Sequence, residues 1–141
     1  VGKSNIIKLI PQPDLLIFET EYHRRSELLK NKDIKIMLDY FEKLSTKLFV
    51  LLLFGSYAKK TNTKHSDIDL MFIVSDKLEE ALEKEIFNIA HTIPLKLHIH
   101  MIKETDFIAM KDSKKTTVGS EAIANNVILY GIEDYYEMVK E

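Results

Sequence analysis

The sequence predicts an α/β (α+β) fold in which a small mixed β-sheet is packed with helices. Its apolar segments follow the order helices, strand, strand, helix, strand, helices, which is typical of a sheet covered by helices. The predicted strands at 48–54, 67–74 and 95–102 are short and carry either a continuous or an alternating apolar pattern. With 141 residues and only four Gly and three Pro, the chain has the size of one domain and lacks the composition of a low-complexity protein.

Two helices are predicted before the sheet. Asp14 is a suitable N-cap for the first helix, whose apolar residues recur at helical spacing to about Lys30. Asn31 and Lys32 interrupt this pattern, and Asp33 is expected to cap the second helix. The apolar stripe of the second helix consists of Ile34, Met37, Leu38, Phe41 and Leu44.

Three strands are predicted next. Residues 48–54 are all apolar and end at Gly55, which favours a strand buried on both faces. This run is too short to cross a bilayer, which needs about 20 residues in a helix, so no membrane association is expected. The segment 95–102, after Pro94, alternates between apolar and polar residues. Side chains alternate between the two faces of the strand at 67–74. One face therefore carries only apolar side chains, those of Ile68, Leu70, Phe72 and Val74.

Further helices are predicted around and after the third strand. Asp76 and Glu79 form a capping-box-like pair before an apolar helical stripe. A polar helix is expected from about Glu104, followed by a helix over 117–130 that Gly131 ends as a C-cap. A short terminal helix would then bury Ile132, Tyr135, Tyr136 and Val139.

Charge and cysteine content exclude several classes of function. The formal net charge is -2, so a nucleic-acid partner has only the small cluster of Lys111, Lys114 and Lys115 in its favour. The chain has no cysteine, which excludes disulfides, thiolate metal sites and cysteine nucleophiles. Since the sequence also contains no basic-then-apolar leader, a cytoplasmic protein is expected.

Gly55 and Ser56 come directly after the buried strand at 48–54. A strand-to-helix turn at this point would present free backbone N–H groups and a hydroxyl, which together bind phosphate well. Gly55 would allow the backbone to approach the phosphate closely. The alternative is an ordinary helix N-cap formed by Ser56.

Asp67 and Asp69 begin the strand at 67–74. Because side chains alternate along a strand, both carboxylates are expected on one face, where they repel each other unless a cation lies between them. Mg²⁺ is the expected cation, since it binds one or two carboxylates together with substrate phosphates and water. The alternative is a solvated strand end.

Taken together, these segments read Gly-Ser-x10-Asp-x-Asp between two apolar strands. This arrangement resembles the polymerase-beta-type nucleotidyltransferase superfamily, and in particular its minimal nucleotidyltransferases, with their Gly-Ser-x-Ala-x-Gly and Ser-Asp-Ile-Asp-Leu signatures. Gly55, Ser56 and Ala58 match the first signature, and residues 66–70 match the second in full. The resemblance implies the nucleotidyltransferase (polymerase-beta-like) fold over one domain, residues 1–141.

The resemblance also implies an activity. Gly55, Ser56 and Ser66 would bind a nucleoside triphosphate, and Asp67 and Asp69 would hold Mg²⁺, with Mn²⁺ as an alternative. A nucleoside monophosphate would pass from the triphosphate to a hydroxyl of an unknown acceptor, with pyrophosphate as the leaving group. Residues 1–13 weakly resemble the join to an upstream winged-helix module and are interpreted as its remnant.

Two departures from the family pattern limit this inference. Lys60 stands where the first signature has its second Gly, in a position expected to be left-handed. The third carboxylate that active members carry on a later strand is missing, and His98 and His100 lie on the polar face of that strand instead. Three interpretations stay open. A histidine acts as metal ligand or general base; Asp76, Glu104 or Glu121 supplies the acid; or the site binds nucleotide without turnover.

Two functions therefore follow from the sequence. The first is a nucleotidyltransferase acting on a hydroxyl of an unknown acceptor, for which a partner protein is one candidate. The second is a catalytically impaired nucleotide-binding module that serves as an antitoxin-like partner of a small helical toxin or as a regulatory sensor. The Gly-Ser turn and the aspartate pair favour the first, and the missing third acid favours the second.

Overall fold

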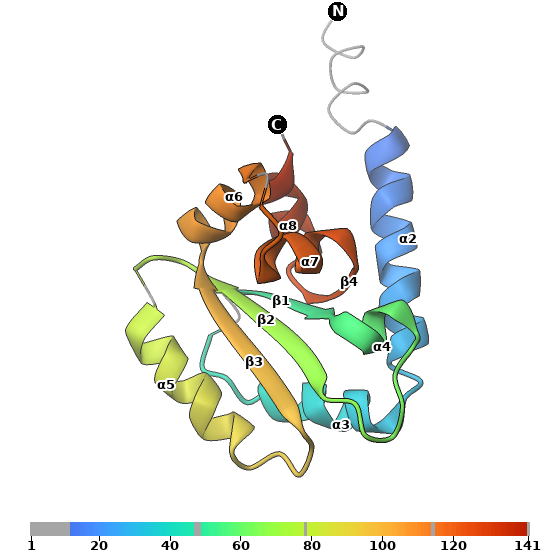
Figure 1. Cartoon of the computed structure of the whole chain (residues 1–141), viewed down its shortest axis with the longest axis vertical. Coiled ribbons are helices and arrows are strands. Elements are labelled where there is room, and N and C mark those ends of the chain that lie inside the picture. The colour runs from blue at the N-terminus through green and yellow to red at the C-terminus, as the bar shows by residue number, and fades with distance from the viewer. Residues whose placement is uncertain (1–11, 47–48, 78, 114, 141) are drawn as a thin grey trace, which may run out of the picture.

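The computed structural model describes residues 12–46, 49–77, 79–113 and 115–140. Its centre is a mixed sheet with the strand order β3-β2-β1-β4 (Figure 1). Strand β1 pairs antiparallel with β2 and β4, whereas β2 and β3 run parallel. The strands are β1 (Phe49–Phe54), β2 (Ile68–Val74), β3 (Leu97–Lys103) and β4 (Asn126–Tyr130). The predicted mixed sheet packed with helices is confirmed.

Helices cover both faces of this sheet. One layer is formed by α3 and α5, and the other by α6, α7 and α8, while α2 runs along β4 and α4 follows β1 directly (Figure 1). Their bounds are α2 (Gln12–Leu28), α3 (Lys32–Phe41), α4 (Gly55–Lys59), α5 (Glu79–Ala90), α6 (Glu104–Asp112), α7 (Val118–Ala124) and α8 (Ile132–Val139). No helix in these described ranges is long and apolar enough to cross a bilayer.

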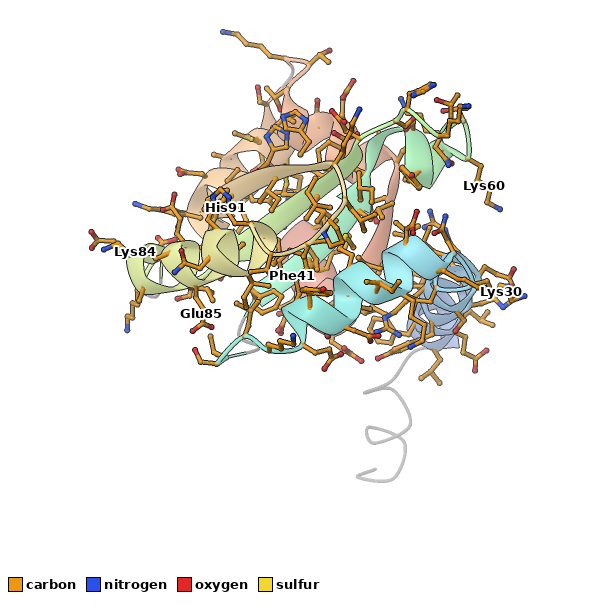
Figure 2. The ribbon with its side chains drawn as sticks, turned by 90° about the horizontal axis from the view of Figure 1, so that it is seen from below. Lys30, Phe41, Lys60, Lys84, Glu85 and His91 are labelled. Atoms are coloured by element: carbon orange, nitrogen blue, oxygen red, sulfur yellow. The ribbon has the colours of Figure 1, made fainter. Side chains whose placement is uncertain are left out.

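The two faces of the sheet carry separate apolar cores, as the alternation along β2 predicts. One core contains Phe72 and the other contains Met71, and each takes every second residue of the strand. Phe41 points from α3 toward the sheet (Figure 2), and its ring lies 5.1 Å from that of Phe72 in an edge-on arrangement. All six residues of β1 are buried, so this strand contributes to both cores.

The helix predicted over 117–130 is wrong in its second half. Thr117 caps the short helix α7, and the chain then forms β4 from Asn126 onward. Val127 and Leu129 pack in one core, whereas Ile128 packs in the other, which is the period of a strand. Pairing with β1 decides the outcome, because without β4 one side of a fully buried strand would leave its backbone groups unpaired.

Gly131 is the N-cap of α8 rather than the end of a helix. It has φ +80°, and a Cβ there would lie 3.0 Å from Val50 Cγ2 and 3.1 Å from the Phe49 carbonyl oxygen. The predicted C-cap is therefore wrong, and the left-handed backbone of Gly131 serves the junction from β4 to α8. The sequence shows that a glycine is present at position 131. Only the structure shows that Phe49 and Val50 leave no room for a Cβ there.

Helix α2 covers the outer edge of β4. The guanidinium groups of Arg24 and Arg25 donate hydrogen bonds to the carbonyl oxygens of Asn126 and Leu129, the second at 2.9 Å. Arg24 also pairs with Glu21 at 3.1 Å. An edge strand with free carbonyl groups invites pairing with another chain, so these contacts close that edge.

Three helix starts differ from the predictions. Residues 12–14 already belong to helix α2, so Asp14 is not its N-cap, and Asn31 rather than Asp33 caps α3 by accepting from the Asp33 and Ile34 amides. Asp76 and Lys77 lie in a turn before α5 (Glu79–Ala90), and Asp76 accepts a hydrogen bond from the Thr105 hydroxyl. Short polar side chains have several competing partners near a helix start. The winged-helix interpretation concerns a segment that, up to residue 11, lies outside the described residues.

Candidate functional site

A row of paired residues crosses the sheet where β1 ends and β2 and β3 begin. Phe54 pairs with Asp69, which pairs in turn with His98. Residues paired across neighbouring strands place their side chains on the same face. The carboxylate of Asp69 and the imidazole of His98 therefore meet on the face that carries Phe54.

Gly55 lies directly against the Asp69 carboxylate. It has φ +70°, and a Cβ at this position would lie only 2.1 Å from Asp69 Oδ2. Any other residue would therefore both strain the backbone and overlap the carboxylate. The structure brings the Gly-Ser turn and one of the two predicted acids together.

Ser56 is the second residue of α4 and not its N-cap. The N-cap is Phe54, which has no side-chain capping hydrogen bond. The alternative interpretation of Ser56 as an ordinary N-cap is therefore wrong. The half-buried Ser56 shares the first turn of α4 with Gly55, and its carbonyl oxygen accepts from the Thr61 amide at 2.9 Å.

Lys60 ends α4 in the left-handed conformation expected for the missing glycine, with φ +61° and ψ 29°. Among the described residues, it is the single non-glycine with positive φ. Its side chain extends outward at one end of the molecule (Figure 2). Lysine thus adopts the left-handed conformation at this position at a cost of about 1 kcal/mol.

Asp67 and Ser66 lie in the segment leading into β2. Asp67 is exposed and has no hydrogen bond or ion pair within the described part of the chain. The Ser66 hydroxyl accepts from the Thr63 amide at 2.9 Å and so closes the turn before Asp67. A free carboxylate two residues from Asp69 remains available to a ligand.

His98 and His100 occupy the strand beside Asp69, on the face the alternation predicts. His98 Nδ1 lies 3.1 Å from Asp69 Oδ1, while 58% of the His98 side chain stays exposed. The two imidazole rings are 4.4 Å apart, and the His100 ring lies 5.7 Å from that of Phe54. Burial lowers the pKa of His100 and the neighbouring His98 adds to this, whereas Asp69 opposes it.

Two of the candidate third acids lie at the wrong end of the sheet. Strands β2 and β3 run parallel, with Asp69 and His98 near their starts. Asp76 follows the end of β2, and Glu104 follows the end of β3. That is a separation of about 20 Å along a rigid sheet. Glu121 is exposed on α7. Over the described ranges, no three His, Asp or Glu side chains are grouped so that they could hold a metal ion.

Asn126 is a residue of this end of the sheet that the sequence did not reveal. It pairs with Phe54 and is buried, and its amide donates to the Ala122 carbonyl oxygen at 2.6 Å and to the Tyr135 hydroxyl at 3.0 Å. These bonds fix the start of β4 beside the turn at Gly55. The sequence does not indicate that Asn126 is buried, because a helix rather than a strand is predicted over this segment.

Comparison with known proteins identifies the family. Residues 32–135 match the model of the family described as polymerase beta, nucleotidyltransferase. The chain belongs to this nucleotidyltransferase family. The matched region contains all four strands and the complete Gly55, Asp67 and Asp69 arrangement.

Two solved structures are similar to this family member. A crystal structure of a toxin-antitoxin with AMP-PNP shares 21% identity, with a TM-score of 0.49, over 76% of this chain and 80% of that one. A Sulfolobus solfataricus protein solved as a candidate nucleotidyltransferase shares 17% identity, with a TM-score of 0.47, over 80% of this chain and 88% of that one. A search of the curated proteins finds no match.

Lys60→Gly is expected to raise the free energy of unfolding by about 1 kcal/mol, because glycine adopts the left-handed conformation without strain. Lys59→Gly is the matched control. It lies in the helical part of α4 and should lower stability by about 0.5–1 kcal/mol. Urea denaturation measures both changes, and a loss of stability in Lys60→Gly would contradict the assigned turn.

Gly55→Ala is expected to lower the free energy of unfolding by about 2 kcal/mol or more, because the new methyl group strains the backbone and overlaps Asp69. In an Asp69→Ala background the overlap with the carboxylate is removed and only a 3.2 Å contact with the Cβ at position 69 remains, so the cost should fall to about 1 kcal/mol. A double-mutant cycle by denaturation measures this coupling. Additive effects would show that the two residues do not touch.

Proposed function

We propose that this chain transfers a nucleoside monophosphate from a nucleoside triphosphate to a hydroxyl group of an acceptor. The contact between Gly55 and the Asp69 carboxylate carries this proposal, because it brings the glycine-serine turn and an acid to one place. Membership of the nucleotidyltransferase family supports the type of reaction. The base of the nucleotide and the acceptor are not assigned.

The phosphates are assigned to the turn at the start of α4. The close-packed backbone at Gly55 and the hydroxyl of Ser56 would bind the β- and γ-phosphates, while Ser66 holds the segment before Asp67. A bond would form between the acceptor oxygen and the α-phosphorus. The bond between the α-phosphorus and the oxygen that bridges it to the β-phosphorus would break, and pyrophosphate would leave.

The carboxylates of Asp67 and Asp69 fit a hard divalent cation. Mg²⁺ needs only one or two carboxylates in addition to phosphate and water oxygens, which suits one exposed and one partly exposed aspartate. Mn²⁺ would also tolerate the nearby imidazole. When bound, the ion would neutralise the charge of the phosphates and of the leaving pyrophosphate.

His98 is the residue that we assign to the place of the third acid. Its Nδ1 contacts Asp69, and its largely exposed ring is open to an incoming hydroxyl. It would accept the proton that the acceptor hydroxyl loses. His100 packs between Phe54 and His98 and would hold the His98 ring in this orientation.

A second candidate function is a nucleotide-binding module with little or no turnover. It is favoured by one observation: in the described part of the chain, the acids and histidines form no group of three that could hold a metal ion. Such a module would act as an antitoxin-like partner of a helical toxin or as a regulatory sensor. Binding and turnover therefore need separate measurement.

Asp67→Asn and Asp69→Asn are expected to reduce pyrophosphate release from labelled nucleoside triphosphates by about 100-fold or more, because the metal-binding charge is lost. Asp76→Asn is the matched control, since this exposed aspartate follows the far end of the same strand. Turnover that survives in both site variants would contradict the proposal. Nucleotide binding by calorimetry without turnover in Mg²⁺ or Mn²⁺ would establish the second candidate.

His98→Ala is expected to lower the turnover number by about 100-fold, a typical effect of losing a general base. His98→Asn is the informative comparison, because its amide can replace Nδ1 in the contact with Asp69 but cannot accept the proton. We expect His98→Asn to retain nucleotide binding and still to lack turnover. If this variant is as active as the wild type, His98 only positions Asp69.

A further inference from the structure

Exposed apolar side chains gather on α2. Five large apolar side chains are exposed in the described residues, and four of them belong to this helix, whereas the fifth, Ile36, lies on α3. Single exposed apolar residues are ordinary on a protein surface, but a cluster of them marks an interaction site. The four are Leu15 (40% exposed), Leu16 (59%), Ile17 (39%) and Tyr22 (48%).

The first part of α2 is apolar on every side. Residues 15–18 are Leu, Leu, Ile and Phe, so one full helical turn has no polar face. A helix that is apolar all round is normally enclosed by other structure. Of these four residues, Phe18 is the one that packs against a core, with its ring 5.9 Å from that of Tyr136. The other three stay partly exposed among the described residues, Leu16 the most.

A groove continues this apolar turn toward α8. It has a volume of about 400 Å³, and its apolar lining comes from both helices. Figure 1 shows α2 along one side of the molecule, with its first turns beyond β4 and on the side of α8. We call the α2–α8 surface the set of Leu15, Leu16, Ile17, Phe18, Tyr136 and Val139.

Helix α2 is firmly held behind this surface. The buried Glu21 accepts a hydrogen bond from the Tyr136 hydroxyl at 3.1 Å and pairs with Arg24. Arg25 is bound to the Leu129 carbonyl oxygen of β4. An apolar surface on an anchored helix offers a preorganised contact, so little ordering is lost when a partner binds.

The charges at the border of the α2–α8 surface are mainly acidic. Glu19 is exposed, and Glu133 accepts from the Tyr22 hydroxyl at 3.1 Å; no ion pair of either carboxylate is found in the described ranges. Lys140 is the basic residue of the groove, and its ammonium group is already paired with Glu137 at 2.7 Å. The excess of negative charge selects a positively charged partner.

We propose that the α2–α8 surface binds an amphipathic helix of another protein, with an apolar stripe flanked by lysine and arginine. A second copy of this chain fits less well, because a symmetric pair would place the acidic border with Glu19 and Glu133 against the same acidic border of the other copy. A membrane surface fits less well because anionic lipid headgroups would meet the same acids. A basic-flanked helix satisfies both the apolar turn and the acidic border.

This docking site goes beyond the proposed nucleotidyl transfer. The end of α2 at Leu28 lies beside α4 and lines a cavity together with Tyr57, whereas Ile17 lies 11 residues earlier. That is about 16 Å along the helix axis. A helix bound at Ile17 would leave Asp69 accessible, so the partner and a nucleotide can be bound together.

The test uses two synthetic helical peptides with the same leucine stripe, one flanked by lysines and one by glutamates. Fluorescence anisotropy should show tighter binding of the lysine peptide. The double substitution Leu15→Ser with Leu16→Ser should weaken that binding by about tenfold, because it removes much of the apolar contact. Ile36→Ser is the matched control and should leave binding unchanged.

Further arms separate the competing explanations. Glu133→Gln should reduce the preference for the lysine peptide, and Asp69→Asn should bind it as the wild type does, whatever its effect on turnover. Equal binding of both peptides, or equal loss in Ile36→Ser, would overturn the proposal. Concentration-dependent dimerisation that the leucine substitutions abolish, or flotation with phosphatidylserine vesicles, would overturn it in favour of a second copy or a membrane.

Discussion

The contact between Gly55 and Asp69 is the constraint on which the candidate site depends. The backbone of the turn can meet Asp69 Oδ2 only because position 55 has no Cβ. The register of β1 against β2 sets this contact, since Phe54 pairs with Asp69. A slip of one residue would turn Asp69 toward the opposite core. The fully buried β1 therefore fixes the position of Asp69 against Gly55 as well as the centre of the fold.

The two edges of the sheet have different surroundings. At β4, the guanidinium groups of Arg24 and Arg25 close the carbonyl edge and fasten α2 to the domain. At β3, the other edge, His98 stays largely exposed beside Asp69. The same fold thus keeps the candidate reaction site open on one side and presents the apolar turn of α2 on the other. The proposed docking surface and the candidate reaction site therefore lie on different sides of the sheet.

Local patterns predicted most of the fold, and long-range pairing decided the rest. The strands at 48–54 and 67–74 were recognised because a core strand needs an uninterrupted or alternating apolar run. The segment 126–130 has an equally apolar run, and helical and strand periods are hard to separate over five residues. Its partner β1 lies more than 70 residues earlier in the chain, so the need to pair that strand is invisible locally. The same holds for Gly131, whose neighbours come from β1.

The sequence by itself determined the chemical groups: a glycine-serine turn, two aspartates with a period of two, a lysine in a left-handed position and histidines where an acid is expected. Residue type and spacing suffice for these, because they follow from the geometry of one strand or one turn. Only the tertiary structure decided which groups meet. It brought Asp69 against Gly55 and His98, placed Asp76 and Glu104 at the far end of the sheet, and left the apolar turn of α2 uncovered in the described chain. Such contacts depend on strand order and register, which arise from packing over the whole domain.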